Sequence, residues 1–119
     1  MLGPTFSALT GLNNASKRLQ NSANNLSNVQ TVGFKKGEIN SVENKTGGTR
    51  VNSISKVNTQ GGLIPTNNPL DLAIEGKGSN VDIAEEMVDQ IVAKAAFKAN
   101  FNIIKANDEM IGSLLDIKS

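Results

Sequence analysis

The chain has 119 residues, a net charge of +1, and no cysteine, histidine, tryptophan or tyrosine. Without cysteine and histidine it lacks the usual zinc ligands, thiol nucleophiles and imidazole bases, so no catalytic, cofactor-binding or metal-binding residue is predicted. The small net charge argues against a nucleic-acid-binding surface. No segment approaches the roughly 18 consecutive apolar residues of a membrane span, so no membrane insertion is expected.

An amphipathic helix is predicted from Pro4 to about Gln30, because apolar residues recur there at spacings of three and four. Pro4 suits a first helical turn, where its missing N–H removes no intrahelical bond. Gly33 fits the stop, since glycine adopts the left-handed conformation that closes many helices. The apolar face consists of Ala8, Leu12, Ala15, Leu19, Leu26 and Val29, widened by Phe6 and Leu9.

Residues 33–79 are rich in Gly, Asn, Ser and Thr and are predicted to form an extended connection with turns at TGG, QGG and TNNP. Two groups of apolar residues within it favour two short strands, paired or separate. A solvated loop is the alternative. The two groups are Val51, Ile54 and Val57, and the alternating Leu70, Leu72 and Ile74.

A longer helix is predicted from Asn80 to about Ile117, with Asn80 or Ser79 as its N-cap. Its apolar residues form a line whose spacing repeats as 3-4-4, an eleven-residue period that favours nearly straight or slightly right-handed pairing. This line consists of Val81, Ala84, Val88, Val92, Ala95, Ala99, Ile103, Ala106, Met110, Leu114 and Ile117.

A second apolar line runs beside the first, through Ile83, Met87, Ile91, Phe97, Phe101, Ile104, Ile111 and Leu115. Together the two lines cover more of the helix than one partner helix can bury. Either the chain is a monomeric helical hairpin with a satellite apolar cluster, or its helices pack against copies of itself or related chains. Contacts that run head to tail without closing a ring would produce a helical filament or tube.

The expected fold is therefore mainly α. An N-terminal core helix (1–32) and a C-terminal core helix (80–119) pair as an antiparallel coiled-coil-like core, and a short irregular or β segment (33–79) connects them. The residues expected in the assembly core are Leu12, Leu19, Leu26, Val88, Val92, Ala95, Ala99, Ile103, Ala106, Met110 and Leu114.

Three segments resemble the flagellar rod and hook family. The sequence ANNLSNVQTVGFKK (23–36) resembles the family's ANNLANVxTxGFK-like signature at the end of the N-terminal helix. GGLIPTNNPLDLAIEGKG (61–78) is similar to the segment before the family's middle domain, and residues 79–117 are similar to its C-terminal helix. Ser27 and Gln30 are minor departures. The signature residues present are Ala23, Asn24, Asn25, Leu26, Asn28, Gly33 and Phe34.

The resemblance implies a structural subunit of the bacterial flagellum, in the periplasm-spanning basal-body rod or the hook. In this family the terminal helices pair and line a hollow tube. The implied partners are copies of the chain, other axial proteins and the flagellar type III export apparatus. Export without a cleaved signal peptide is expected, and the N-terminus indeed lacks the basic start and apolar core of such a peptide.

One departure from the family concerns the outer domain. Longer members continue into a large outer domain, whereas here Gly78 passes directly to Ser79. The chain is therefore expected to be either a naturally compact rod protein or a shortened version of a longer member.

The asparagines of the signature have two interpretations. Asn24, Asn25 and Asn28 are either solvated amides at an ordinary helix end, or they fix the junction between the helix and the outer segment. Gly33 would let the chain reverse and Phe34 would tuck under the turn. Lys35 and Lys36 are assigned no site.

An enzyme and a helical adaptor or export chaperone are the alternatives to a structural role. An enzyme is least favoured, because capping and a solvated face explain the acidic residues Asp82, Glu85, Glu86 and Asp89. A helical adaptor or export chaperone of the flagellar secretion system, binding a partner's amphipathic helix, is the remaining alternative.

Overall fold

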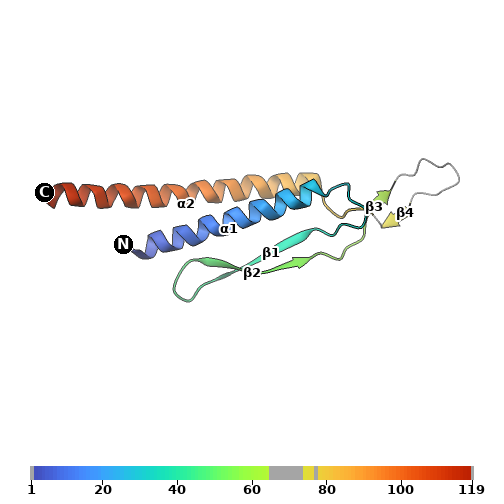
Figure 1. Ribbon diagram of the computed structural model, residues 1–119, viewed down its shortest axis with the longest axis horizontal. Helices are drawn as coiled ribbons and strands as arrows, with labels where there is room; N and C mark the ends of the chain where they lie inside the picture. Colours follow the sequence, from blue (N-terminus) through green and yellow to red (C-terminus); the bar gives the residue numbers. More distant parts are fainter. Residues whose placement is uncertain (1, 65–73, 77, 119) are drawn as a thin grey trace.

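The computed structural model describes residues 2–64, 74–76 and 78–118. The molecule is long and thin, measuring 82 × 26 × 14 Å. Helices α1 (Leu2–Ser27) and α2 (Ile83–Lys118) lie side by side and antiparallel, which confirms the predicted fold class (Figure 1). A hairpin of β1 (Gly37–Glu43) and β2 (Thr49–Lys56) lies along α1. No helix of the described chain is long and apolar enough to cross a membrane.

Helix α1 ends at Ser27, about three residues before the predicted end. The chain then continues in turns, in which the N–H of Thr31 donates to the carbonyl of Asn28 and that of Phe34 to the carbonyl of Thr31. Gly33 lies among them with a φ of 75°, so the expected left-handed glycine is present.

The N-cap of α2 is Asp82, so the prediction of Asn80 or Ser79 is wrong. The Oδ1 atom of Asp82 accepts hydrogen bonds from the backbone N–H of Ala84, at 2.9 Å, and of Glu85, at 3.4 Å. The helix starts at the next residue, Ile83. Asn80 is not available for capping, because its side chain is bonded to the strands.

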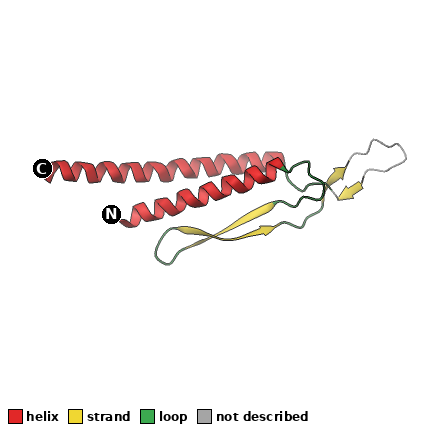
Figure 2. Cartoon of the chain, viewed as in Figure 1, coloured by secondary structure: helices red, strands yellow, loops and turns green. Residues whose placement is uncertain are grey.

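The described part of residues 33–79 contains four strands rather than two (Figure 2). The strand predicted around Val51–Val57 is β2, but its antiparallel partner is β1, where polar residues gave no strand signal. Ile74 opens β4 (Ile74–Gly76), which pairs with β3 (Gly61–Ile64). The TGG turn is confirmed, whereas the QGG sequence runs into β3. Leu70, Leu72 and the TNNP turn lie outside the described residues.

The two helices are joined by small and polar side chains. The buried apolar residues of the described chain are Ala8, Ala15 and Ala93. A Cβ atom added to Gly11 would lie 2.6 Å from the side-chain amide of Asn100, which shows how closely the helices approach. Small residues permit this close approach. The helices are therefore held by van der Waals contacts of small side chains and backbone rather than by large interlocking side chains.

The contact face of α2 repeats every seven residues, with steps of four and three. Among the described side chains of α2, the residues that are not fully exposed are Glu86, Gln90, Ala93, Asn100, Ile104 and Asn107. This is the period of an ordinary coiled-coil seam. The 3-4-4 line is therefore not the surface by which the two helices of one chain meet.

The 3-4-4 line is turned away from α1. At 100° per residue it lies roughly 120° around α2 from the seam. Val88 and Val92 are accordingly 57% and 56% exposed. The second line is closer to α1, because Ile104 is half-buried and Phe97 lines a depression together with Leu9 and Leu12.

Gly48 offers a test of how the hairpin is seated on α1. Its φ is 82°, and an added Cβ would lie 2.3 Å from Oγ1 of Thr10. We expect Gly48→Ala to lower the free energy of unfolding by about 2 kcal/mol, because a left-handed alanine is strained and also collides. Gly33→Ala is the matched control, since Gly33 has a similar φ but open space around it, and should lose only about 1 kcal/mol. Urea unfolding followed by circular dichroism measures both, and equal losses would show that the Thr10 contact is unimportant.

Candidate functional site

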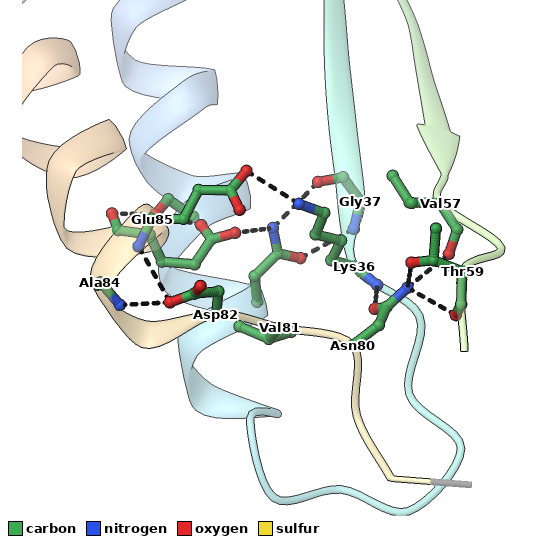
Figure 3. A network of polar contacts seen from close by, with 12 residues as sticks. Lys36, Gly37, Val57, Thr59, Asn80, Val81, Asp82, Ala84 and Glu85 are labelled. Atoms are coloured by element: carbon green, nitrogen blue, oxygen red, sulfur yellow. Dashed lines mark hydrogen bonds and ion pairs between the residues drawn. The ribbon is translucent and has the colours of Figure 1, made fainter. Parts of the chain in front are cut away.

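A polar junction joins the end of α1, the start of α2 and the start of β1 (Figure 3). Asn25 is its centre and is only 1% exposed. Its Oδ1 accepts from the N–H of Gly37 at 2.9 Å, and its Nδ2 donates to the Gly37 carbonyl at 3.0 Å. The amide therefore pairs with Gly37 as a neighbouring β-strand would. The same Nδ2 donates to Oε1 of Glu86 at 3.1 Å, so one side chain links all three elements.

Glu86 is buried against α1, at 2% exposure, which corrects the prediction that it lies on a solvated face. Ser22 Oγ lies 2.7 Å from Oε2 of Glu86 and 3.0 Å from its backbone carbonyl, so its hydroxyl proton can be donated to either. Ser22 and Asn25 are three residues apart and share one face of α1. The buried carboxylate is therefore held by two donors of the facing helix, as a buried charge requires.

Asn80 links the segment before α2 by hydrogen bonds to residues that flank β1 and β2. Its Oδ1 accepts from the N–H of Lys36 at 2.7 Å, and its Nδ2 donates to the carbonyl of Val57 at 2.8 Å. Its own N–H donates to the carbonyl of Phe34 at 3.3 Å. Lys36 precedes β1 and Val57 follows β2. Asn80 therefore holds the open end of the hairpin next to the start of α2.

The two lysines that were assigned no site both have partners in this region. Lys35 Nζ donates to the carbonyl of Thr59 at 2.6 Å. Lys36 Nζ forms an ion pair with Oε1 of Glu85 at 3.0 Å. The hydrogen bond to Glu85 raises the pKa of Lys36, and partial burial opposes this increase. Their sequence position beside the helix end gave no sign of these partners, which are 24 residues from Lys35 and 49 residues from Lys36 in the chain.

We expect Lys36→Met to lower the free energy of unfolding by less than about 1 kcal/mol at neutral pH, because Glu85 is largely exposed. The folded state raises the pKa, so the contribution of the lysine is complete below its unfolded pKa of about 10.4 and is lost as the pH rises through the folded pKa. Urea titrations of both proteins between pH 7 and 11 should therefore show a constant difference that shrinks only at the alkaline end. A difference that shrinks in the neutral range would contradict this assignment.

The signature asparagines divide between the two predicted roles. Asn25 fixes the junction, whereas Asn24 and Asn28 act locally at the helix end. Asn28 Nδ2 donates to the carbonyl of Asn24 at 2.8 Å, and its Oδ1 accepts from Thr31 Oγ1 at 3.1 Å. Asn24 and Ala23 are exposed, and Leu26 is half-buried.

The glycine and phenylalanine of the signature complete the turn. Phe34 is half-buried, and Lys56 Nζ lies 5.4 Å from the centre of its ring, within the range of a cation–π contact. Gly33 is exposed and supplies the left-handed conformation. These two residues lead the chain from α1 into β1.

The buried polar side chains of the junction are hydrogen-bonded. Every buried side-chain nitrogen and oxygen atom of the described residues has a hydrogen-bond partner. A cavity of about 240 Å³ remains beside the junction and is lined by charged residues of both signs, Arg18, Lys36, Glu38, Glu85, Glu86 and Asp89 among them. The arrangement holds three elements at fixed positions, which is a structural task.

Comparison with known proteins points to the same task. Residues 77–117, which include nearly all of α2, match the family described as flagellar basal body rod FlgEFG protein C-terminal. The chain is also 31% identical over 100 residues to the flagellar hook protein FlgE of Borreliella burgdorferi (strain ATCC 35210 / DSM 4680 / CIP 102532 / B31), an alignment that covers 66% of this chain. Both similarities support a protein of the flagellar rod and hook family.

The family match covers only one side of the junction. The family match contains Asn80, Glu85 and Glu86 but not their partners on α1 and β1. The alignment covers 23% of the hook protein, so this chain spans less than a quarter of that relative's length.

Proposed function

We propose that this chain is a structural subunit of the flagellar axial structure, in the basal-body rod or the hook, and that it polymerises into a hollow helical tube through its paired terminal helices. Similarity to the family supports an axial structural role. The observation that carries the proposal of polymerisation is the apolar surface that α2 leaves exposed.

This surface holds most of the large apolar side chains of the helix. The seam with α1 uses small and polar residues, so the large ones remain uncovered. Contiguous apolar patches of this kind are rare on soluble monomers and mark interfaces. Those that are at least half exposed are Ile83, Met87, Val88, Ile91, Val92, Phe101, Met110, Leu114, Leu115 and Ile117.

The proposed assembly core follows from this exposure. Val88, Val92, Ala95, Ala99, Ile103, Ala106, Met110 and Leu114 form one exposed line on α2 and would face neighbouring subunits. The alanines in the middle of this line would allow another helix to approach closely. On α1, Leu19 is exposed and Leu12 and Leu26 are half-buried, so α1 would contribute a smaller share of the contacts.

The proposed partners are copies of this chain, other axial proteins and the flagellar type III export apparatus. A small core supports export in an unfolded form, because the described chain buries only alanines among its apolar residues and such a core stabilises the monomer weakly. Stability would then come mainly from contacts between subunits, and the mature protein would keep its N-terminal segment.

The test is assembly of the purified full chain. Sedimentation velocity over a range of concentrations, followed by negative-stain electron microscopy, should show large polymers above a critical concentration. The alternative role of adaptor or export chaperone expects a small complex of fixed size with a partner helix. A monodisperse monomer or small oligomer at all concentrations, together with a normal axial structure in cells lacking the protein, would contradict the proposal.

A further inference from the structure

An apolar groove runs between α1 and α2. Its lining includes Leu19, Met87 and Ile91, with Phe97 at one end, and its volume is about 720 Å³. Ser16 and Phe97 also line the adjoining depression, which Leu9 and Leu12 extend along α1. The two depressions therefore form one apolar groove, hereafter the interhelix groove, in which Met87 and Ile91 are more than half exposed.

The other end of the molecule carries an apolar overhang. Helix α2 has 36 residues and α1 has 26. Ser22 lies beside Glu86, and Asn107 is hydrogen-bonded to Thr5, so the C-terminal end of α2 extends past the start of α1 (Figure 1). The overhang, residues 110–117, exposes more than half of Met110, Leu114, Leu115 and Ile117.

The charges around the groove and the overhang are complementary. Among the described residues that line the interhelix groove, Lys94 is the only charged one, and none is acidic. Three acidic residues and one basic residue lie in or next to the overhang, namely Asp108, Glu109, Asp116 and Lys118. Of these acidic residues, Asp116 lies in the last turn of α2, where a negative charge opposes the helix dipole.

We propose that the overhang of one copy of this chain occupies the interhelix groove of the next copy. This rests on the proposed function and specifies the contact through which polymerisation proceeds. The acidic residues in and next to the overhang would face Lys94 in the groove, and the apolar side chains of both surfaces would be covered together.

The groove and the overhang lie far apart along α2, so the proposed contact does not close on itself. Ile91 and Leu114 are separated along α2 by roughly 35 Å at 1.5 Å per residue. A subunit whose overhang fills one neighbour therefore keeps its own groove for another. Such a head-to-tail contact continues as a filament rather than closing as a dimer.

Cysteine cross-linking tests the contact, because the full chain contains no native cysteine. Ile91→Cys places a thiol in the groove, Leu114→Cys places one on the overhang, and Ile54→Cys is the control on the exposed hairpin. A bismaleimide is added to mixtures of two variants of different tagged mass under polymerising conditions. The 91–114 adduct should form at least about ten-fold more than the 54–114 adduct, and a chain with both Ile91→Cys and Leu114→Cys should give a ladder of oligomers.

The other outcomes overturn the proposal. A dominant 114–114 adduct would show that overhangs pair with each other, and a closed 91–114 dimer without a ladder would show reciprocal rather than head-to-tail contact. Sedimentation of the same samples separates the two proposals. Polymers without the 91–114 adduct overturn this contact alone, whereas the absence of polymers from the wild-type chain overturns the proposed function as well.

The charge contribution is tested with Lys94→Glu and the matched Lys45→Glu, which makes the same change in the turn of the hairpin. Lys94→Glu should raise the critical concentration about five-fold at low salt and less at high salt, because exposed charge pairs are weak and screened. Lys45→Glu should change it less than about two-fold. Equal effects of the two variants would contradict Lys94 as a recognition feature of the groove.

Discussion

Replacement of Ile103 by aspartate is expected to block incorporation of the chain into the axial structure. Ile103 lies on the exposed 3-4-4 line of α2 and is 47% exposed in the single chain, so a carboxylate there remains hydrated and the subunit still folds. In the polymer the same side chain would be covered by a neighbouring subunit. Burying an unpaired carboxylate costs several kcal/mol, and the penalty recurs at every subunit.

The matched control is Ile54→Asp, which introduces the same charge at a site on β2 that is 61% exposed. It should leave assembly nearly unchanged, because the hairpin is not part of the proposed core. Both variants are expressed in cells that lack the native protein, with export and motility measured separately. If Ile103→Asp is exported and supports normal motility, the proposed assembly core is wrong.

The sequence predicts the two helices well because their hydrophobic periodicity is long and strong. The face by which they meet was not predictable in the same way. The contact depends on Ala8, Gly11 and Ala93, whose small size lets the backbones approach, and on polar residues such as Asn100. A search for large apolar residues instead finds the surfaces that this chain leaves exposed, such as the 3-4-4 line.

The junction was predictable only in part. The cluster of asparagines left open whether they are solvated amides at a helix end or fix the junction, and Asn25 has the second role. The partner residue Glu86 was assigned to a solvated face, because its neighbours Asp82, Glu85 and Asp89 are acidic and exposed. The signal that would have identified it is its spacing of seven residues from Ala93, which becomes informative once the period of the seam is known.

The polar hairpin could not be predicted from hydrophobic periodicity either. Strand β1 has the sequence GEINSVE and is held to α1 by side-chain hydrogen bonds rather than by an apolar face. Asn14 Nδ2 lies 3.0 Å from Ser41 Oγ, and Asn21 Nδ2 donates to the carbonyl of Gly37 at 2.8 Å. Strands held in this way have no alternating hydrophobicity, so they resemble loops in sequence.

Glu86→Ala is expected to lower the free energy of unfolding by about 3 kcal/mol, because it removes one of the two acceptors of Asn25 and one acceptor of Ser22 and leaves a cavity in the seam. For a domain of this size that corresponds to a decrease in Tm of roughly 10 °C. Glu85→Ala is the matched control, since the neighbouring carboxylate is exposed and should contribute less than about 1 kcal/mol.

Glu86→Gln separates charge from hydrogen bonding at the same position. The glutamine keeps an oxygen that can accept from Asn25, and it should therefore lose only about 1 kcal/mol. Thermal unfolding followed by circular dichroism, below the critical concentration for assembly, measures all three variants. Equal Tm values for Glu86→Ala and Glu85→Ala would show that the junction does not hold the helices together. A large loss confined to Glu86→Ala would mean that one buried carboxylate fixes the helix pair, and hence the relative position of the groove and the overhang through which subunits are proposed to join.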